Sequence, residues 1–541
     1  MGKRKPLYRF FEIFPALISY AAVLLLFLLS YLNPVWGVGY VLLIVVVVFV
    51  KAIGVAFRTL NGYSIMHRAL KVDWRERLVQ LKNPRKYYDE LKSEKHTSFG
   101  YQKHLENLRF ISAAETGDYP DPDQIIHAVI VAIYNESLDV LRPTIDAVKN
   151  TAYPNKQIVM VLAYEERGGA ATKETVETLQ KEYKGVFLDM FPALHKEGIK
   201  NEVVGKGGNI TNAGRFLAKY FRKQKVRFSD VIVTTLDSDN RPHKYYFDAV
   251  AYEYICCPDR KRRSYQPVSL FTNNIWDAPA MMRVIATGNS FWTVVSSMRP
   301  HILRNFASHS QSLDALSEMD FWSTRSITED GHQYWRSYFY FDGNYSVLPI
   351  HLPMGQDAVL SFTFWKTLKG QFVQLRRWAY GAADIAYVAT RLFSRRRNVP
   401  FGDCLMKLWR LIDSHVTWAY TALIVMFGGF IPVLFSPSAR TNIAAQELPR
   451  IVSLIQTVAM IGLFVTIIMS IRMLPKRPKR YKKGKTVLMV IQWVLMPVTS
   501  IVYNSASAFY AQTRLALGLY MNKFDVTDKA TKYDKMETKG G

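Results

Sequence analysis

The sequence predicts an α/β domain with a doubly wound parallel sheet, inserted between N-terminal and C-terminal transmembrane helices. Three observations predict this class: apolar runs lie near both ends of the 541-residue chain, strand and helix patterns alternate from residue 124, and a strand pattern ends in Asp237 and Asp239. The expected segments are two transmembrane helices in residues 1–57, a juxtamembrane helical linker in 58–123, the α/β domain in 124–400, interfacial and transmembrane helices in 401–520, and a tail in 521–541.

The composition narrows the class of partner. A formal net charge of +26 is typical of proteins that bind nucleic acid or an anionic membrane surface. No zinc-finger, RNA-recognition or helix-turn-helix pattern is present, and much of the positive charge lies beside apolar runs, as in residues 3–5 and 476–485. These positions favour a membrane surface over nucleic acid as the partner. Three cysteines fit neither a disulfide framework nor a zinc site, so we expect reduced thiols facing the cytosol.

Two N-terminal runs are long enough to cross a bilayer. Residues 14–32 are uncharged and span about 28 Å as a helix, while residues 37–57 contain a single charge, Lys51, near their end. The link between them has no Lys or Arg, whereas both outer flanks do. Positive flanks stay inside, so we expect an integral plasma (inner) membrane protein whose catalytic domain is cytosolic.

The central part alternates between strand and helix patterns. The expected strands are residues 125–133, 157–163, 186–190 and 231–236, and the expected helices are residues 138–150, 172–183, 209–223 and 244–255. Such alternation predicts a parallel sheet with helices on both faces, which is the usual architecture of a nucleotide-binding unit.

Three apolar runs follow, at residues 411–435, 451–473 and 487–510. The cationic stretch 472–485 places its loop in the cytosol, and a single span after it would put the tail outside. Pro497 interrupts the last run, and two shorter helices forming a hairpin would instead return the tail to the cytosol. We favour the hairpin, although the number and topology of helices after residue 486 stay open.

The two aspartates lie where the strand at 231–236 opens into a loop. Ligands of open α/β sheets bind at this carboxyl edge. Asp237 and Asp239 are suited to hold Mg²⁺ or Mn²⁺, hard cations that also bind a substrate diphosphate. The alternative is a loop whose aspartates make turn hydrogen bonds.

Further polar clusters follow the other strands of the predicted sheet. Tyr134 and Glu136 come after the first strand, and Glu166 comes after the second. Lys206 precedes two glycines and a helix that contains Asn212, a pattern in which the backbone approaches a phosphate near a helix N-terminus. The alternative for this pattern is an ordinary turn.

Two more clusters lie downstream. Glu329 and Asp330 are adjacent carboxylates in a polar turn, and one of them is suited to act as general base on an acceptor hydroxyl. The alternative is a helix N-cap. In the second cluster, Arg377 can pair with diphosphate oxygens and Trp378 can stack on a sugar, the alternative being an interfacial helix.

Taken together, these motifs resemble those of membrane-embedded family-2 glycosyltransferases, the group of cellulose, chitin and hyaluronan synthases. The resemblance covers residues 125–381 and the flanking helices, and it includes Asp-Ser-Asp at 237–239, Thr-Glu-Asp at 328–330 and Gln-x-x-Arg-Trp at 374–378. Residues 524–529 resemble the Phe-x-Val-Thr-x-Lys gating loop of cellulose synthases. The resemblance implies a glycosyltransferase A-type domain.

It also implies roles for individual residues. Asp330 would be the catalytic base, Asp239 would bind the metal, and Asp237 would contact both the nucleotide and the metal. The other roles are these: Tyr134, Glu136, Glu166, Lys206 and Asn212 in nucleotide-sugar binding, and Glu329, Gln374, Arg377 and Trp378 in acceptor and diphosphate binding.

The expected activity is therefore an inverting, metal-dependent transfer of sugar from a nucleotide-diphosphate sugar to a polysaccharide acceptor, in processive synthesis with export. The alternative is a single transfer to a membrane lipid, and a remote alternative is an inactive membrane-anchored protein that binds nucleic acid or another partner. The sequence leaves open the sugar, the nucleotide base, the acceptor, the oligomeric state, and any accessory subunits or allosteric ligands.

Overall fold

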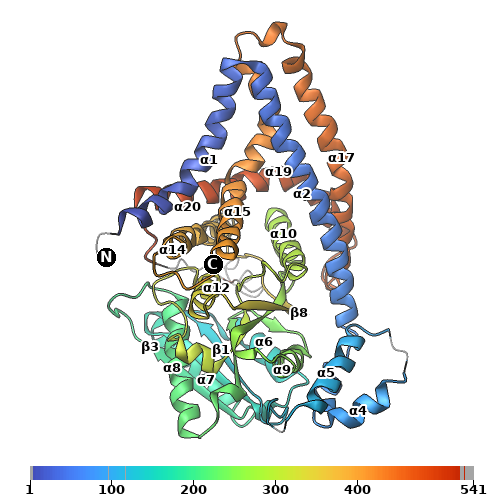
Figure 1. Cartoon of the computed structure of the whole chain (residues 1–541), viewed down its shortest axis with the longest axis vertical. Coiled ribbons are helices and arrows are strands. Elements are labelled where there is room, and N and C mark those ends of the chain that lie inside the picture. Colours follow the sequence, from blue (N-terminus) through green and yellow to red (C-terminus); the bar gives the residue numbers. More distant parts are fainter. Residues whose placement is uncertain (1–3, 95–96, 116, 524–528, 530–541) are drawn as a thin grey trace.

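The computed structural model describes residues 4–94, 97–115, 117–523 and 529. A sheet domain lies at the bottom of Figure 1, and long helices rise above it. The helices are α1 (Pro6–Leu32), α2 (Pro34–Ala69), α3 (Trp74–Gln80), α4 (Pro84–Leu91), α5 (Tyr101–Ala113), α6 (Leu138–Lys149), α7 (Gly169–Glu182), α8 (Lys206–Lys223), α9 (Tyr246–Ile255), α10 (Ala280–Ser297), α11 (Leu313–Glu318), α12 (Glu329–Tyr340), α13 (Phe364–Ala379), α14 (Ala383–Leu392), α15 (Phe401–Phe427), α16 (Ile431–Phe435), α17 (Ile443–Met473), α18 (Gly484–Ile491), α19 (Met496–Thr499) and α20 (Ala506–Leu517).

The sheet has eight strands in the order β3-β2-β1-β4-β7-β6-β8-β5. Its strands are β1 (Ile126–Ile133), β2 (Ile158–Glu165), β3 (Asp189–His195), β4 (Val231–Asp237), β5 (Arg241–Pro242), β6 (Arg263–Leu270), β7 (His309–Ser312) and β8 (Ser346–Gly355). The first four strands in this order are parallel to one another, whereas β7 is antiparallel to both β4 and β6. The predicted α/β domain between apolar helices is confirmed, but its sheet is mixed rather than wholly parallel.

The parallel half follows the sequence prediction closely. Strands β1, β2 and β4 are buried almost throughout, because helices cover both faces of the sheet. One core contains Leu141 of α6 and Val250 of α9, and the core on the other face contains Leu217 of α8. The prediction for the third strand was misplaced: β3 begins at Asp189 and continues to His195, beyond the short apolar run at 186–190.

Helices α3 and α5 dock on the outer side of α9. Leu78 and Leu108 are fully buried in the same core as the sheet. His104 bridges the elements, since its Nδ1 lies 2.9 Å from the hydroxyl of Tyr252 and its Nε2 lies 2.7 Å from Oε1 of Gln80. The segment expected to be a linker is thus packed firmly against the sheet domain.

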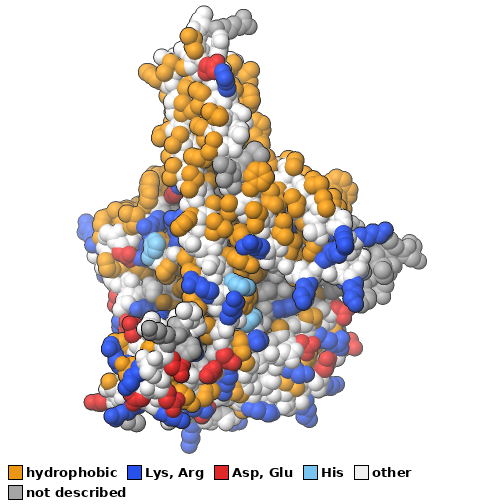
Figure 2. Space-filling view, turned by 90° about the vertical axis from the view of Figure 1, so that its right-hand side faces the viewer, with side chains coloured by type: hydrophobic (Ala, Val, Ile, Leu, Met, Phe, Trp, Pro, Cys, Tyr) orange, Lys and Arg blue, Asp and Glu red, His pale blue; other side chains and the backbone are white. Residues whose placement is uncertain are grey.

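Four helical segments are long and apolar enough to cross a membrane, by length and composition, within the described part of the chain. They are Pro6–Leu32, Pro34–Ala69, Phe401–Phe435 and Gly484–Leu517. Figure 2 shows orange hydrophobic side chains covering the upper part of the molecule, with blue Lys and Arg side chains concentrated below them. This pattern fits a molecule that is embedded in a bilayer by its upper helices.

The last apolar segment does not form one straight helix. Between α18 and α20 the chain passes through α19 and a π-helix at Ser500–Ser505, and in Figure 1 α19 and α20 run across the view, at an angle to the upright α1 and α2. Beyond α20, Lys523 pairs with Val204 and Lys529 pairs with Leu360 as isolated β-bridges. The tail therefore returns to the sheet side, by a crosswise path rather than by a hairpin. Residues 524–528 of the gating-like motif lie outside the described residues.

Candidate active site

The aspartate pair lies at the carboxyl end of β4, in the middle of the sheet. Asp237 is the last residue of β4 and pairs in register with Ala132 of β1. The turn that follows is closed by Asn240, whose Oδ1 accepts a 2.6 Å hydrogen bond from the backbone N of Asp237. Asn240 therefore makes the hydrogen bond of this turn, and the carboxylates of Asp237 and Asp239 bind other groups.

Lys206 connects the aspartate pair to the second carboxylate cluster. Its Nζ lies 2.7 Å from Oδ1 of Asp237 and 3.6 Å from Oε1 of Glu329. Burial would lower the pKa of this lysine, but the carboxylates of Asp237, Glu329 and Asp330 outweigh burial and raise its pKa. One buried ammonium thus faces both carboxylate clusters, which are about ninety residues apart in the sequence.

The glycines after Lys206 lie inside helix α8 and not before it. The helix begins at Lys206, so Gly207 and Gly208 are in its first turn. A Cβ atom at Gly207 would lie 2.4 Å from the carbonyl oxygen of Ser323, and one at Gly208 would lie 2.9 Å from the His195 ring. The two glycines let α8 approach its neighbours, and this close packing presents Lys206 to the site.

Glu329 and Asp330 occupy the first turn of α12, so they follow the N-cap position and do not form it. Thr328 is at the N-cap, and its side chain makes no capping hydrogen bond. Asp330 accepts hydrogen bonds from the backbone N of Ala307 at 2.6 Å and of Gly331 at 2.8 Å, so both of its oxygens are held in place. Burial and the neighbouring Asp330 together raise the pKa of Glu329 to about 7, against the opposing effect of Lys206.

Asp237 behaves in the opposite way to Glu329. Burial alone would raise the pKa of Asp237, but Lys206, Lys529 and Arg377 outweigh burial and lower its pKa. Two nearby carboxyl groups therefore differ in protonation near neutral pH, which is a common feature of sites that move protons.

The residues that follow β1 lie beside the aspartate turn. Glu136 accepts hydrogen bonds from the hydroxyl of Ser238 at 3.0 Å and from the backbone N of Tyr134 at 2.8 Å. The guanidinium of Arg167 lies 4.1 Å from the centroid of the Tyr134 ring and pairs with the buried Glu165. An aromatic ring stacked on a guanidinium is a platform on which a planar base can bind.

The side chains of Glu166 and Asn212, the remaining predicted nucleotide-binding residues, make hydrogen bonds to other parts of the backbone. Glu166 is exposed, and its Oε2 accepts a hydrogen bond from the backbone N of Glu197. Asn212 donates to the carbonyl of Leu194 at the end of β3. A neighbouring asparagine, Asn209, lies closer to the centre, because its amide donates to the carbonyl of Ala163 at 2.8 Å.

Helix α13 contains the Gln-x-x-Arg-Trp motif. Two large apolar side chains at its start, Phe364 and Trp365, are 54% and 76% exposed. Arg377 lowers the pKa of Asp237, which places its charge near the site, and Trp378 packs on Phe271 with ring centroids 6.1 Å apart. Gln374 accepts a 3.1 Å hydrogen bond from Gln371.

The structure adds Lys529 and Asp357 to the residues considered from the sequence. Nζ of Lys529 lies 2.6 Å from Oγ of Ser238 and 2.8 Å from Oδ1 of Asp239. The backbone N of Asp357 donates to Oδ2 of Asp239, and burial together with Asp239 raises the pKa of Asp357 to about 6. Lys529 belongs to the gating-like motif, which was a signal in the sequence. Asp357 had none.

The donor set is compatible with a divalent cation. No group of three His, Cys, Asp or Glu side chains within the described ranges could hold a metal ion by itself. Asp237 and Asp239 provide two carboxylates, and Oδ1 of Asp357 is buried with no hydrogen-bond partner beside them. Such an oxygen-only set suits Mg²⁺ or Mn²⁺ when substrate phosphates complete the coordination.

The solved structures that resemble this chain include two proteins of low sequence identity. No protein-family model matches the chain, and no curated protein matches it either. A mannosyltransferase from Pyrobaculum calidifontis, solved with GDP-mannose and Mn²⁺, is 14% identical, with a TM-score of 0.40 over 77% of this chain and 97% of that one. TarS from S. aureus, solved with UDP-GlcNAc, is 11% identical, with a TM-score of 0.34 over 73% and 92% of the two chains.

Proposed function

We propose that this chain is an inverting glycosyltransferase that transfers a sugar from a nucleotide-diphosphate sugar to an acceptor hydroxyl at the membrane. The observation that supports this best is the position of Lys206, whose ammonium faces Asp237 on one side and Glu329 on the other. A diphosphate held near Asp237 and an acceptor held near Asp330 would then be within reach of one sugar.

The proposed reaction uses Asp330 as the base. Its carboxylate takes the proton from the acceptor hydroxyl, whose oxygen forms a bond to the anomeric carbon from the face opposite the phosphate. The bond from that carbon to the phosphate oxygen breaks, and its electron pair leaves with the nucleotide diphosphate. The hydrogen bonds from Ala307 and Gly331 hold the base in position.

The leaving diphosphate needs positive charge nearby. Lys206 and Arg377 supply it from the chain, because both lie close enough to Asp237 to lower its pKa. Asp237 and Asp239 would hold a divalent cation, which when bound adds electrostatic stabilisation of the departing diphosphate. Tyr134 and Arg167 would receive the nucleotide base, while Glu136 keeps Ser238 and the aspartate turn in place.

The features that concern the acceptor lie on helix α13. Helix α13 next to the site, with Trp378 near the sheet edge, suits a growing polysaccharide that leaves through the membrane helices. A membrane lipid is the alternative acceptor. We place the sheet domain in the cytosol and the helices in the plasma membrane, because positive charge is concentrated on the sheet side of the apolar helices.

Replacing the base tests the reaction. Asp330→Asn should reduce transfer by about 10²–10⁴-fold, the usual contribution of a general base, while donor affinity stays nearly constant. Asp320→Asn is the matched control, because Asp320 is an exposed carboxylate paired with Arg215 outside the site. Normal turnover by Asp330→Asn would refute the assignment of the base.

A second measurement separates the two acceptors. Purified protein in lipid is incubated with labelled donor, and the length of the product is determined. A polymer supports processive synthesis, whereas one sugar attached to lipid supports the alternative. Release of free nucleotide with no transferred sugar would contradict both.

A further inference from the structure

Three arginines outside the proposed reaction site converge where the membrane helices meet the sheet domain. They are Arg58 of α2, Arg299 just after α10, and Arg410 of α15. Within the described part of the chain, none of the three guanidinium groups has a hydrogen bond or an ion pair. Arg58 and Arg299 are half-buried and Arg410 is exposed, so all three guanidinium groups are available to a phosphate, whose geometry the planar guanidinium matches.

The relative level of α2 and α15 is set by an ion pair between Lys51 and Asp413, with Nζ 3.2 Å from Oδ2. Arg58 follows Lys51 by seven residues and Arg410 precedes Asp413 by three, so each lies on the same helix face as its neighbour in the pair. Both arginines are displaced from this pair toward the sheet domain. The facing sides of α2 and α15 therefore direct them toward the same region.

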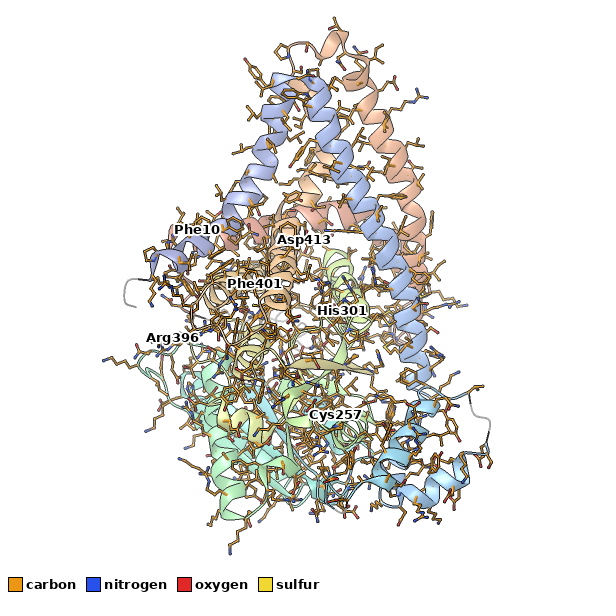
Figure 3. The ribbon with its side chains drawn as sticks, in the orientation of Figure 1. Phe10, Cys257, His301, Arg396, Phe401 and Asp413 are labelled. Carbon is orange, nitrogen blue, oxygen red and sulfur yellow. The ribbon has the colours of Figure 1, made fainter. Side chains whose placement is uncertain are left out.

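The end of α10 completes this region. A Cβ atom at Gly62 of α2 would lie 2.6 Å from the side chain of Val294 and 3.1 Å from that of Met298, so α2 and α10 touch there. Gly62 is one turn beyond Arg58, and Arg299 follows Met298 directly. Figure 3 labels Asp413 and His301, and both lie where the upper helices meet the sheet domain.

The charges in this region are of one sign. Burial lowers the pKa of Arg299, and the like charges of Arg58 and Arg410 lower it further. Burial also lowers the pKa of His301, with Arg410, Arg299, Lys407 and Arg58 adding to the effect. The two carboxylates of α15 are already engaged, because Asp413 pairs with Lys51 and Asp403 pairs with Lys407.

The depth of the three arginines matches lipid headgroups. Arg58 is 24 residues beyond Pro34, or about 36 Å along α2, just past a hydrocarbon layer of about 30 Å. The residues next to the arginines are apolar and open: Phe57 is 64% exposed and Trp409 is 65% exposed. An acyl chain can therefore lie against the helices while its phosphate reaches the guanidinium groups.

We propose that Arg58, Arg299 and Arg410 form a binding site for the phosphate headgroup of an anionic membrane lipid. Each guanidinium donates to phosphate oxygens, a geometry that arginine makes better than lysine. The site is separate from the carboxylates of the proposed reaction, and it holds whether or not that reaction is correct.

The test uses full-length protein in nanodiscs of phosphatidylcholine that contain a minor fraction of phosphatidylglycerol, with bound lipid counted by native mass spectrometry. We expect one phosphatidylglycerol retained per chain, with at least a tenfold preference over phosphatidylcholine. The triple variant Arg58→Gln, Arg299→Gln, Arg410→Gln should lose the preference. The charge-preserving Arg→Lys triple variant should keep only part of it, because an ammonium cannot make the two parallel hydrogen bonds of a guanidinium.

The matched control removes three other cations near the membrane, by Arg395→Gln, Arg396→Gln and Arg397→Gln. An equal loss in this control would show diffuse attraction and overturn the site, as would the absence of any preference in the unaltered protein, a measurement that needs no variant. Soluble glycerol phosphate provides the last arm. If it displaces the lipid at equal concentration, the site binds free phosphate and the lipid proposal is wrong.

Discussion

Glu329 provides a prediction whose size follows from the structure. Its side chain is buried beside Lys206 and Asp330, and burial raises its pKa from 4.5 to about 7. The folded state thus holds the proton more tightly than the unfolded state does. Ionising the group in the folded protein costs about 3 kcal/mol, the free energy that corresponds to this change in pKa.

The size of this cost depends on pH. At pH 5 the folded protein keeps Glu329 protonated, and the cost is below about 1 kcal/mol. Above pH 7 the carboxylate is ionised in both states and the full cost applies. Glu329→Gln, which resembles the protonated acid, should therefore raise the unfolding temperature at pH 8.5 by about 3–6 °C and change it little at pH 5.

Tryptophan fluorescence during heating of the purified protein, without donor and with EDTA, measures the two midpoints. Glu318→Gln is the control, because Glu318 is exposed and paired with Lys261, and an exposed pair contributes about 1 kcal/mol or less. If Glu329→Gln shifts the midpoint equally at both pH values, the carboxyl is not perturbed as the structure indicates.

Three further predictions concern charged groups. Lys206→Met should weaken donor binding at least tenfold and destabilise the fold by about 3–5 kcal/mol, because Asp237 loses its partner; calorimetry and thermal unfolding measure these effects. Lys529→Gln should increase Mn²⁺ affinity several-fold, measured by electron paramagnetic resonance, since Asp239 is no longer shared with an ammonium. Burial raises the pKa of Asp248 from 3.8 to about 7, so Asp248→Asn should stabilise the protein by about 4 kcal/mol above pH 7, with no gain below pH 4 in thermal unfolding.

Each of these predictions has a control or a refuting outcome. Lys219→Met removes an exposed lysine from the same helix as Lys206 and should leave donor binding unchanged. Weaker Mn²⁺ binding by Lys529→Gln would mean that this lysine does not compete for Asp239. A uniform effect of Asp248→Asn across pH would show that Asp248 is ionised at its ordinary pKa.

Sequence patterns identified the parallel half of the sheet because its strands are continuous apolar runs. These patterns did not identify strand β7, because its residues His309 to Ser312 are polar. They are nevertheless buried, and their side chains make hydrogen bonds such as the one of 2.7 Å between Ser310 and Thr234. Strand β8 contains Pro349 and Pro353, which usually argue against a central strand. Its irregular pairing with β6 around Pro267 accommodates them.

The site was predictable only in part, for a related reason. Asp237 was found because a strand pattern leads into it, and Glu329 because two carboxylates are adjacent in the sequence. Asp357 lies after β8, whose existence was not predicted, so nothing in the local sequence pointed to it. The use of Gly207 was also hidden, because the carbonyl it approaches belongs to Ser323, more than one hundred residues away.

The return of the tail also affects the order in which the site is assembled during synthesis. Lys529 follows Asp239 by 290 residues in the chain, yet it supplies the ammonium beside this carboxylate near the middle of the sheet. Strand β4 and its aspartates therefore emerge from the ribosome well before this counterion does. The charge balance of the site is completed only after the C-terminal helices, which lie between the two residues in the sequence, have been synthesised.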